Sequence, residues 1–174
     1  MKKIISAILM LSLVAAMLAS CNGGGADITL PPEETISPVA EDTVYSFIYK
    51  NTAITPHAKM SELLNGIGDP ASYEESPSCL YQGLDKDYTY PGFKLRTYPE
   101  NEVDYVLNVC FTDDSVATPE GIMLGSSRND VINAYGTSFT EQNGNVVYVK
   151  ENTELRFRFD GDSVSAIEYW AIEK

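Results

Sequence analysis

The chain has 174 residues, 44% of them hydrophobic, which is enough for one sizeable core or two small ones. Its formal net charge of −13 argues against binding to nucleic acid or to anionic lipid surfaces, because both repel an acidic protein. One histidine and three cysteines are too few soft ligands for a structural zinc site, and no metal or cofactor is expected.

Residues 1–20 have the pattern of a secretory signal peptide. Lys2 and Lys3 precede an apolar run over 4–18, and spanning a membrane takes about 20 apolar residues, so this run is too short. The sequence over 18–21, LASC, resembles the bacterial lipobox, which implies that Cys21 is acylated and becomes the mature N-terminus. We therefore expect a protein held by lipid on the extracytoplasmic face of the cell membrane.

Residues 21–42 are expected to form a disordered, acylated linker, since glycine, proline and acidic residues dominate them. Alternating aromatic and β-branched residues over 43–50 predict a strand. A helix is predicted over 59–67, where Met60, Leu63, Leu64 and Ile67 share one face. Gly68 is expected to end this helix.

The next part is predicted to be rich in strands, with strands over 79–83, 93–98 and 103–112 and a long turn over 84–92. A second helix is predicted over 128–135, with Ser126 or Ser127 as its N-cap. Strands over 146–150, 154–159 and 163–171 follow, joined by the turn signals Asn143-Gly144 and Asp160-Gly161.

The second helix and its approach repeat the first at a fixed offset. Ile122 follows Ile54 by 122 − 54 = 68 positions, and Gly136 follows Gly68 by 136 − 68 = 68. The sequence thus predicts an α+β fold of two tandem helix-plus-antiparallel-strand repeats, 43–118 and 119–174. They are expected to form a layered sheet with both helices on one face.

The turn Gly121-Ile122-Met123-Leu124-Gly125 and the pair Tyr135-Gly136 carry a resemblance to a known family. Over about residues 50–172 the chain resembles the BLIP-like family, named for the β-lactamase inhibitory protein, and more distantly the SmpA/OmlA envelope lipoproteins. The resemblance implies the tandem-repeat fold just described. It implies no contact residues, and none is carried over.

Two states of the remaining cysteines stay open: one disulfide, or two thiols. An exported protein with Cys79 and Cys110 has the right count for one disulfide. The predicted meander, however, places them at opposite ends of a sheet, farther apart than the Cα separation of about 7 Å that a disulfide tolerates. The other possibility is two buried thiols.

Catalysis is not expected. His57 lies near Ser61 and Glu62 in sequence, but three residues on one helical turn seldom converge as a catalytic triad requires, and a solvent-facing turn residue is the simpler interpretation. The acidic turns over 85–87, 113–114 and 160–162 lack the spacing of a calcium-binding loop.

A binding surface is predicted instead. Strand alternation places four basic residues on the sheet face turned away from the helices, with aromatic residues around them that are typical of interface anchors. The predicted binding residues are Lys94, Arg96, Arg156, Arg158, Tyr88, Tyr90, Tyr98 and Trp170. The alternatives are that the cations pair with neighbours such as Glu168 and Asp104, and that the aromatics are simply good strand formers.

These observations favour a lipid-anchored extracytoplasmic binding module that recognises a protein or another envelope macromolecule through an open sheet face. Two alternatives remain at this point: a hydrolase acting on cell-wall material, and a structural subunit of an envelope complex.

Overall fold

The computed structural model describes residues 43–172, of which 49% is strand and 12% helix. The predicted signal peptide over 1–20 and the predicted linker over 21–42, with Cys21, lie outside the described residues. The elements are β1 (Phe47–Tyr49), β2 (Thr52–Ile54), α1 (Met60–Ile67), β3 (Ser72–Pro77), β4 (Leu84–Tyr90), β5 (Phe93–Glu100), β6 (Val103–Phe111), α2 (Arg128–Tyr135), β7 (Thr140–Gln142), β8 (Asn145–Lys150), β9 (Thr153–Asp160) and β10 (Ser163–Ala171). Neither helix in this range has the length and apolar character needed to cross a membrane.

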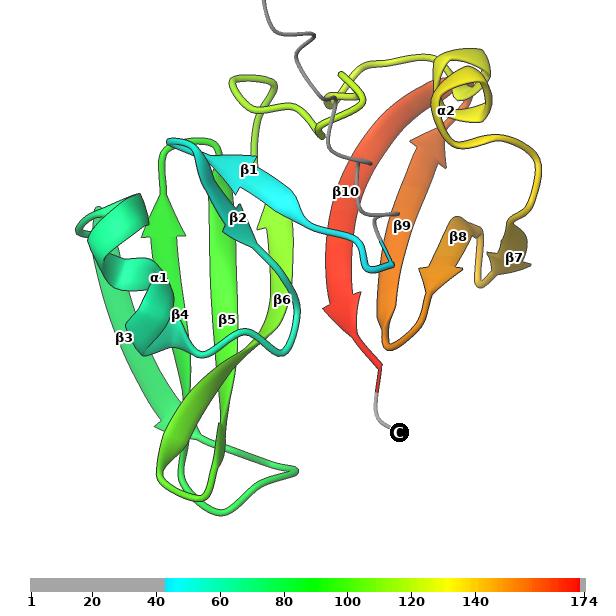
Figure 1. The fold of residues 1–174 in the computed structure, drawn as a ribbon. Helices are drawn as coiled ribbons and strands as arrows, with labels where there is room; N and C mark the ends of the chain where they lie inside the picture. Colours follow the sequence, from blue (N-terminus) through cyan, green and yellow to red (C-terminus); the bar gives the residue numbers. More distant parts are fainter. Residues whose placement is uncertain (1–42, 173–174) are drawn as a thin grey trace, which may run out of the picture. The chain divides into compact units, whose positions relative to one another are not determined.

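Eight of the strands form one antiparallel sheet in the order β3-β4-β5-β6-β10-β9-β8-β7 (Figure 1). The pairing of β6 with β10 joins the two halves, because Cys110 lies opposite Glu168 and Asn108 opposite Trp170. The remaining strands, β1 and β2, form a separate hairpin.

The core lies on one face of this sheet, where strand alternation places a buried apolar residue at every second position. One row across the sheet consists of Tyr88, Leu95, Val109, Tyr169, Leu155 and Tyr148. The β1–β2 hairpin crosses over this face near β6 in Figure 1. Phe47 of β1 contacts Phe93, Phe111 and Tyr169, with ring centroids 5.0, 4.9 and 6.2 Å away. The hairpin therefore packs across the junction between β6 and β10.

The two helices contribute unequally to this core. In α1, Met60, Leu63 and Ile67 are all buried, as their helical spacing predicts, whereas Leu64, the fourth residue of the predicted face, is 40% exposed. In α2 only Val131 is buried. The N-terminus of α2 has a capping box, in which the Ser127 side chain accepts a hydrogen bond from the Asp130 amide and the Asp130 carboxylate accepts one from the Ser127 amide.

The predicted fold class is wrong. The described chain is not two helix-plus-strand repeats with both helices on one face but a mostly β protein built on one eight-stranded antiparallel sheet. The predicted repeats 43–118 and 119–174 contain fewer strands than the structure has. In addition, helices were expected to cover one face of the sheet, whereas the β1–β2 hairpin packs over that face at the junction of β6 and β10.

Several predicted elements also need correction. The predicted strand over 43–50 is the first arm of a hairpin, and the predicted strand over 79–83 is irregular. The predicted long turn over 84–92 contains β4. The charged residues of this segment are typical of a loop, but in the structure they form ion pairs with other strands of the sheet; Lys86, for example, lies 2.7 Å from the Asp104 carboxylate. Strands β2, β3 and β7 were not predicted. Both helices, and strands β5, β6, β8, β9 and β10, lie within one or two residues of their predicted bounds.

Replacing Gly136 by alanine is expected to lower the free energy of unfolding by about 1–3 kcal/mol. Gly136 ends α2 with φ 81° and ψ −168°, a backbone region that is essentially limited to glycine. A Cβ added there would meet no atom within 4 Å, so the whole cost comes from backbone strain. Urea unfolding measures it, and Asn133→Ala, on the exposed surface of the same helix, is the matched control. Equal midpoints for both variants would contradict the prediction.

Candidate functional site

The face of the sheet opposite the core carries the predicted basic residues. Residues that pair directly across antiparallel strands lie on the same face. One row of such pairs joins Lys94, Cys110, Glu168 and Arg156, and the next joins Arg96, Asn108, Trp170 and Glu154. Arg158 follows Arg156 by two positions in β9 and shares this face. We call this surface the open face.

The open face is not a free cationic patch. Arg96 makes two hydrogen bonds to the Asp87 carboxylate, from Nε and Nη2, each 2.7 Å long. The Arg156 Nε atom lies 2.7 Å from Oε2 of Glu154. The alternative of pairing with neighbours is therefore correct, but the partners are Asp87 and Glu154; Asp104 binds Lys86 instead.

Two predicted basic residues have no carboxylate partner within the described part of the chain. Arg158 donates to the side-chain oxygen of Asn145 at 3.3 Å, and Lys94 is exposed at the side of the face near β4. Trp170 lies at the centre of the face, with the Arg156 guanidinium 4.8 Å from its ring and its indole N–H donating to Glu168. This is a mixed aromatic and charged surface with roughly balanced charge.

The prediction that Tyr88 and Tyr90 belong to the binding surface is wrong. Both residues lie in β4 on the core face of the sheet and are 8% and 2% exposed. The Tyr90 hydroxyl donates to the Gly68 carbonyl at 3.0 Å, which ties β4 to the end of α1. Because these residues belong to a strand and not to a turn, alternation sends them inward.

A cleft opens at one end of the open face because β6 leaves β10 there. Arg96 pairs with Asn108 but Thr97 pairs with Val106, so Leu107 is an extra residue in β6, and such a bulge bends its strand. Beyond this point the Val106 backbone bonds to His57 and Ala58 instead of to β10, at 2.8 and 2.9 Å. Figure 1 shows β6 and β10 diverging at this end.

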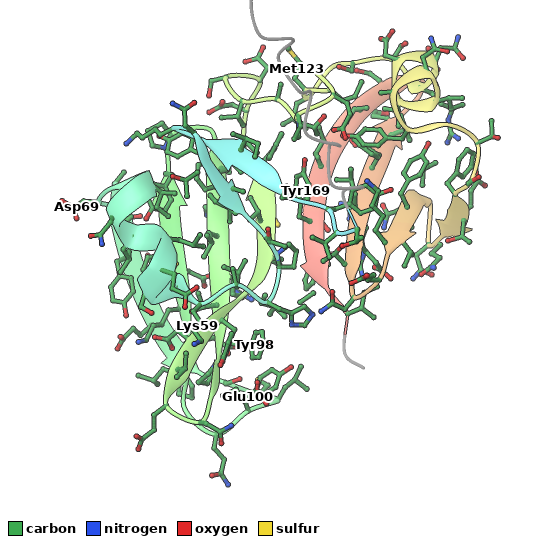
Figure 2. The ribbon with its side chains drawn as sticks, viewed as in Figure 1. Lys59, Asp69, Tyr98, Glu100, Met123 and Tyr169 are labelled. Atoms are coloured by element: carbon green, nitrogen blue, oxygen red, sulfur yellow. The ribbon has the colours of Figure 1, made fainter. Side chains whose placement is uncertain are left out.

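The cleft has two connected parts. The larger, of about 440 Å³, is lined by His57, Tyr81, Tyr98, Glu100, Tyr105, Asn152 and Ile172. The smaller, of about 210 Å³, shares three of these residues and is otherwise lined by Leu80, Leu107, Trp170 and Ala171. We call the first part the polar half of the cleft and the second the apolar slot. In Figure 2, Tyr98 and Glu100 lie together at this end of the sheet.

His57 holds the two sides of the cleft together. Its Nε2 lies 3.2 Å from the carbonyl oxygens of both Asn152 and Ile172, and its Nδ1 lies 3.0 Å from the Tyr98 hydroxyl. Carbonyl oxygens only accept, so Nε2 carries a hydrogen; in the neutral ring Tyr98 then donates to Nδ1. His57 is therefore a half-buried connection between β5, the β8–β9 turn and the end of β10, and not the solvent-facing turn residue that was expected.

Tyr98 is, with Trp170, one of two predicted binding residues that the structure places in the cleft wall. Its ring packs against Tyr81 and Tyr105, with centroids 4.7 and 5.7 Å away and interplanar angles of 30° and 28°. The edge of the His57 ring completes this cluster at 6.2 Å. Tyr81, Tyr105 and Glu100 were missed because nothing local in the sequence indicates that a bulge at Leu107 opens a cleft beside them.

The two described cysteines are free thiols. Cys79 is exposed in the loop between β3 and β4, and Cys110 is partly buried on the open face. Burial, reinforced by the nearby Glu168 carboxylate, raises the pKa of the Cys110 thiol to about 11. Cys110 is therefore protonated at neutral pH and is not an activated nucleophile.

The residues around His57 do not form a catalytic triad. Nδ1 contacts the Tyr98 hydroxyl and Nε2 contacts two backbone carbonyls, and neither nitrogen bonds to Ser61 or Glu62, the two residues that lie nearby in sequence. Within residues 43–172, no three His, Cys, Asp or Glu side chains group closely enough to hold a metal ion.

The chain matches no protein family, no curated protein and no solved structure. The resemblance to the BLIP-like family thus stays a prediction from the sequence.

Proposed function

We propose that this protein is a lipid-anchored extracytoplasmic binding module that recognises a protein or another envelope macromolecule through its open face. The observation that carries the proposal is the juxtaposition of Trp170, under the Arg156 guanidinium, with the cleft at the end of the same face. Tryptophan, tyrosine and arginine are the residues that most often anchor protein interfaces. Here Trp170 and three tyrosines line the cleft, and Arg156 stacks on Trp170 beside it.

The ion pairs of Arg96 and Arg156 favour recognition of a specific partner over general electrostatic attraction to any acidic molecule. Arg96 and Arg156 are held by carboxylates in fixed orientations, so each presents the remaining donors of its guanidinium without free rotation. A preorganised surface loses less side-chain entropy when a partner binds. A partner that matches this pattern of alternating charge is therefore favoured over one that is merely of opposite charge.

The alternative of a cell-wall hydrolase has less support. The only histidine is engaged by three hydrogen-bond partners, and the pKa of Cys110 is raised and not lowered. Turnover of purified muropeptides or glycans by the protein, lost when one carboxylate is replaced, would favour the hydrolase over the binding module.

Site-specific photo-crosslinking in intact cells tests the proposal. A photoreactive amino acid at Lys94 or Val149, both exposed on the open face, is expected to capture a discrete partner. The matched control is the same amino acid at Glu62, which is exposed on α1 on the opposite side of the sheet. Capture from all three positions alike, or from none, would overturn the proposal.

Replacing Cys21 by alanine is expected to release the protein from the membrane fraction. The proposed anchor requires the Cys21 thiol, and each buried methylene of a lipid chain contributes about 0.8 kcal/mol to membrane binding. Fractionation of cells followed by immunoblotting measures the change. Cys79→Ala is the matched control and should leave the protein with the membranes, while membrane retention of Cys21→Ala would exclude lipid anchoring.

A further inference from the structure

We propose that the cleft binds a lysine or arginine side chain of the partner protein, with a neighbouring apolar side chain of that partner in the apolar slot. This inference rests on the proposed function and names the chemistry of its anchor point.

Among the described residues, those that line the polar half of the cleft include a carboxylate and several other oxygen acceptors but no lysine or arginine. The carboxylate of Glu100 lines it, as do the residues whose carbonyl oxygens hold His57, Asn152 and Ile172. Glu100 is exposed and makes no ion pair with another described residue. Lys59, two residues after His57, is paired with Glu62 at 3.7 Å. An incoming ammonium or guanidinium group therefore finds a carboxylate that no described cation neutralises.

The aromatic rings of the cleft favour the same ligand. Tyr81, Tyr98 and Tyr105 line the polar half together, and their packing on one another fixes their orientation. A cation over a tyrosine ring is attracted by the ring quadrupole, by about 0.5–1 kcal/mol at exposed sites and about 2 kcal/mol when desolvated. The tyrosine rings and the Glu100 carboxylate thus provide two kinds of contact to one cationic group.

The apolar slot sets the second requirement. Leu80, Leu107, Trp170 and Ala171 line it, and Leu80 is 79% exposed, so apolar surface remains available at its rim. A volume of about 210 Å³ suits one aliphatic or aromatic side chain and not a larger group. The chain's net charge of −13 also attracts a basic partner over a distance of several ångströms or more. A basic segment with an adjacent apolar residue meets both requirements, whereas a neutral glycan meets neither.

Trp170, the only tryptophan of the chain, reports directly on binding at the slot. The full-length protein in detergent is titrated with the capped tripeptide leucine-lysine-leucine, at up to about 10 mM because a single anchor binds weakly. A saturable change in Trp170 fluorescence is expected. The capped tripeptide leucine-glutamine-leucine, which lacks the charge, should bind more weakly by roughly threefold to tenfold, the worth of one cation–π or charged contact.

Glu100→Gln is expected to remove the preference for the lysine peptide. Glu102→Gln is the matched control, because Glu102 lies in the adjoining β5–β6 turn outside the cleft lining and its loss changes the net charge equally. Equal binding of both peptides, an unchanged preference in Glu100→Gln, or no saturable change would each overturn the inference. Fluorescence changes with cell-wall oligosaccharides but not with the lysine peptide would do so as well. Crosslinking from the open face would still succeed in those cases if the proposed function is correct.

Discussion

Replacing Phe47 by alanine is expected to lower the free energy of unfolding by about 3–5 kcal/mol, as for other buried phenylalanines. Phe47 is 1% exposed and packs against Phe93 of β5, Phe111 of β6 and Tyr169 of β10. Only three residue pairs connect β6 to β10, so the ring supplies contacts across a short junction. Its loss leaves a cavity at the point where the two halves of the sheet meet.

Urea unfolding followed by circular dichroism measures this effect. Ile48→Ala is the matched control, because the neighbouring side chain points away from the core and is 45% exposed. We expect that variant to lie within about 1 kcal/mol of the parent, since it removes little buried apolar area. A similar loss in both variants would mean that the hairpin, and not the packing of Phe47, determines the effect.

Local patterns predicted the parts of this fold that depend on near neighbours. The helix over 128–135 follows from a capping serine and a closing glycine, and the strands β5 and β9 follow from alternation. The β1–β2 hairpin cannot be predicted from local sequence in this way. It turns at Lys50 and Asn51, which both take positive φ angles without the Asn-Gly or Asp-Gly signal of a hairpin.

The same limit explains the corrections at the site. Alternation places Lys94 with Arg96 on one face of β5, and Arg156 with Arg158 on one face of β9, because side chains alternate with period two in any strand. Which carboxylate neutralises each cation depends on the register between strands, and that register is set by contacts far apart in sequence. Because residues 84–92 were predicted to form a turn, strand alternation was not applied to them. Applied to a strand, it places Tyr88 and Tyr90 on the core face.

The cleft was beyond local patterns for a further reason. His57 meets Tyr98, Asn152 and Ile172, which lie 41, 95 and 115 residues away along the chain. The bulge at Leu107 lies in a strand, VDYVLNVCF, that contains neither glycine nor proline to indicate it. A single histidine without nearby catalytic partners was therefore taken as a surface residue, although it holds the cleft together.

Replacing His57 by alanine is expected to lower the free energy of unfolding by about 2–3 kcal/mol and to loosen the end of β10. Each lost hydrogen bond costs about 0.5–1.5 kcal/mol, and partly buried carbonyls left without a donor add to this. His57→Asn separates the contributions, because asparagine tolerates the φ of 68° that His57 adopts but lacks the imidazole ring. Tyr98→Phe removes only the hydroxyl and keeps the ring, so its cost should be that of one hydrogen bond.

Amide hydrogen exchange gives the decisive measurement for His57. The Ile172 amide donates at 2.9 Å to the Asn152 carbonyl oxygen, which is also one of the two oxygens that His57 Nε2 binds. If His57 connects the two sides of the cleft, exchange at Ile172 should accelerate in both His57→Ala and His57→Asn, and Trp170 emission should shift to longer wavelength as water enters the slot. Exchange in α2, where Val131 lies in the far part of the core, should change only by the global loss of stability. Unchanged protection of the Ile172 amide from exchange would contradict the prediction. It would show that the end of β10 is held by its neighbouring strands alone and does not depend on His57.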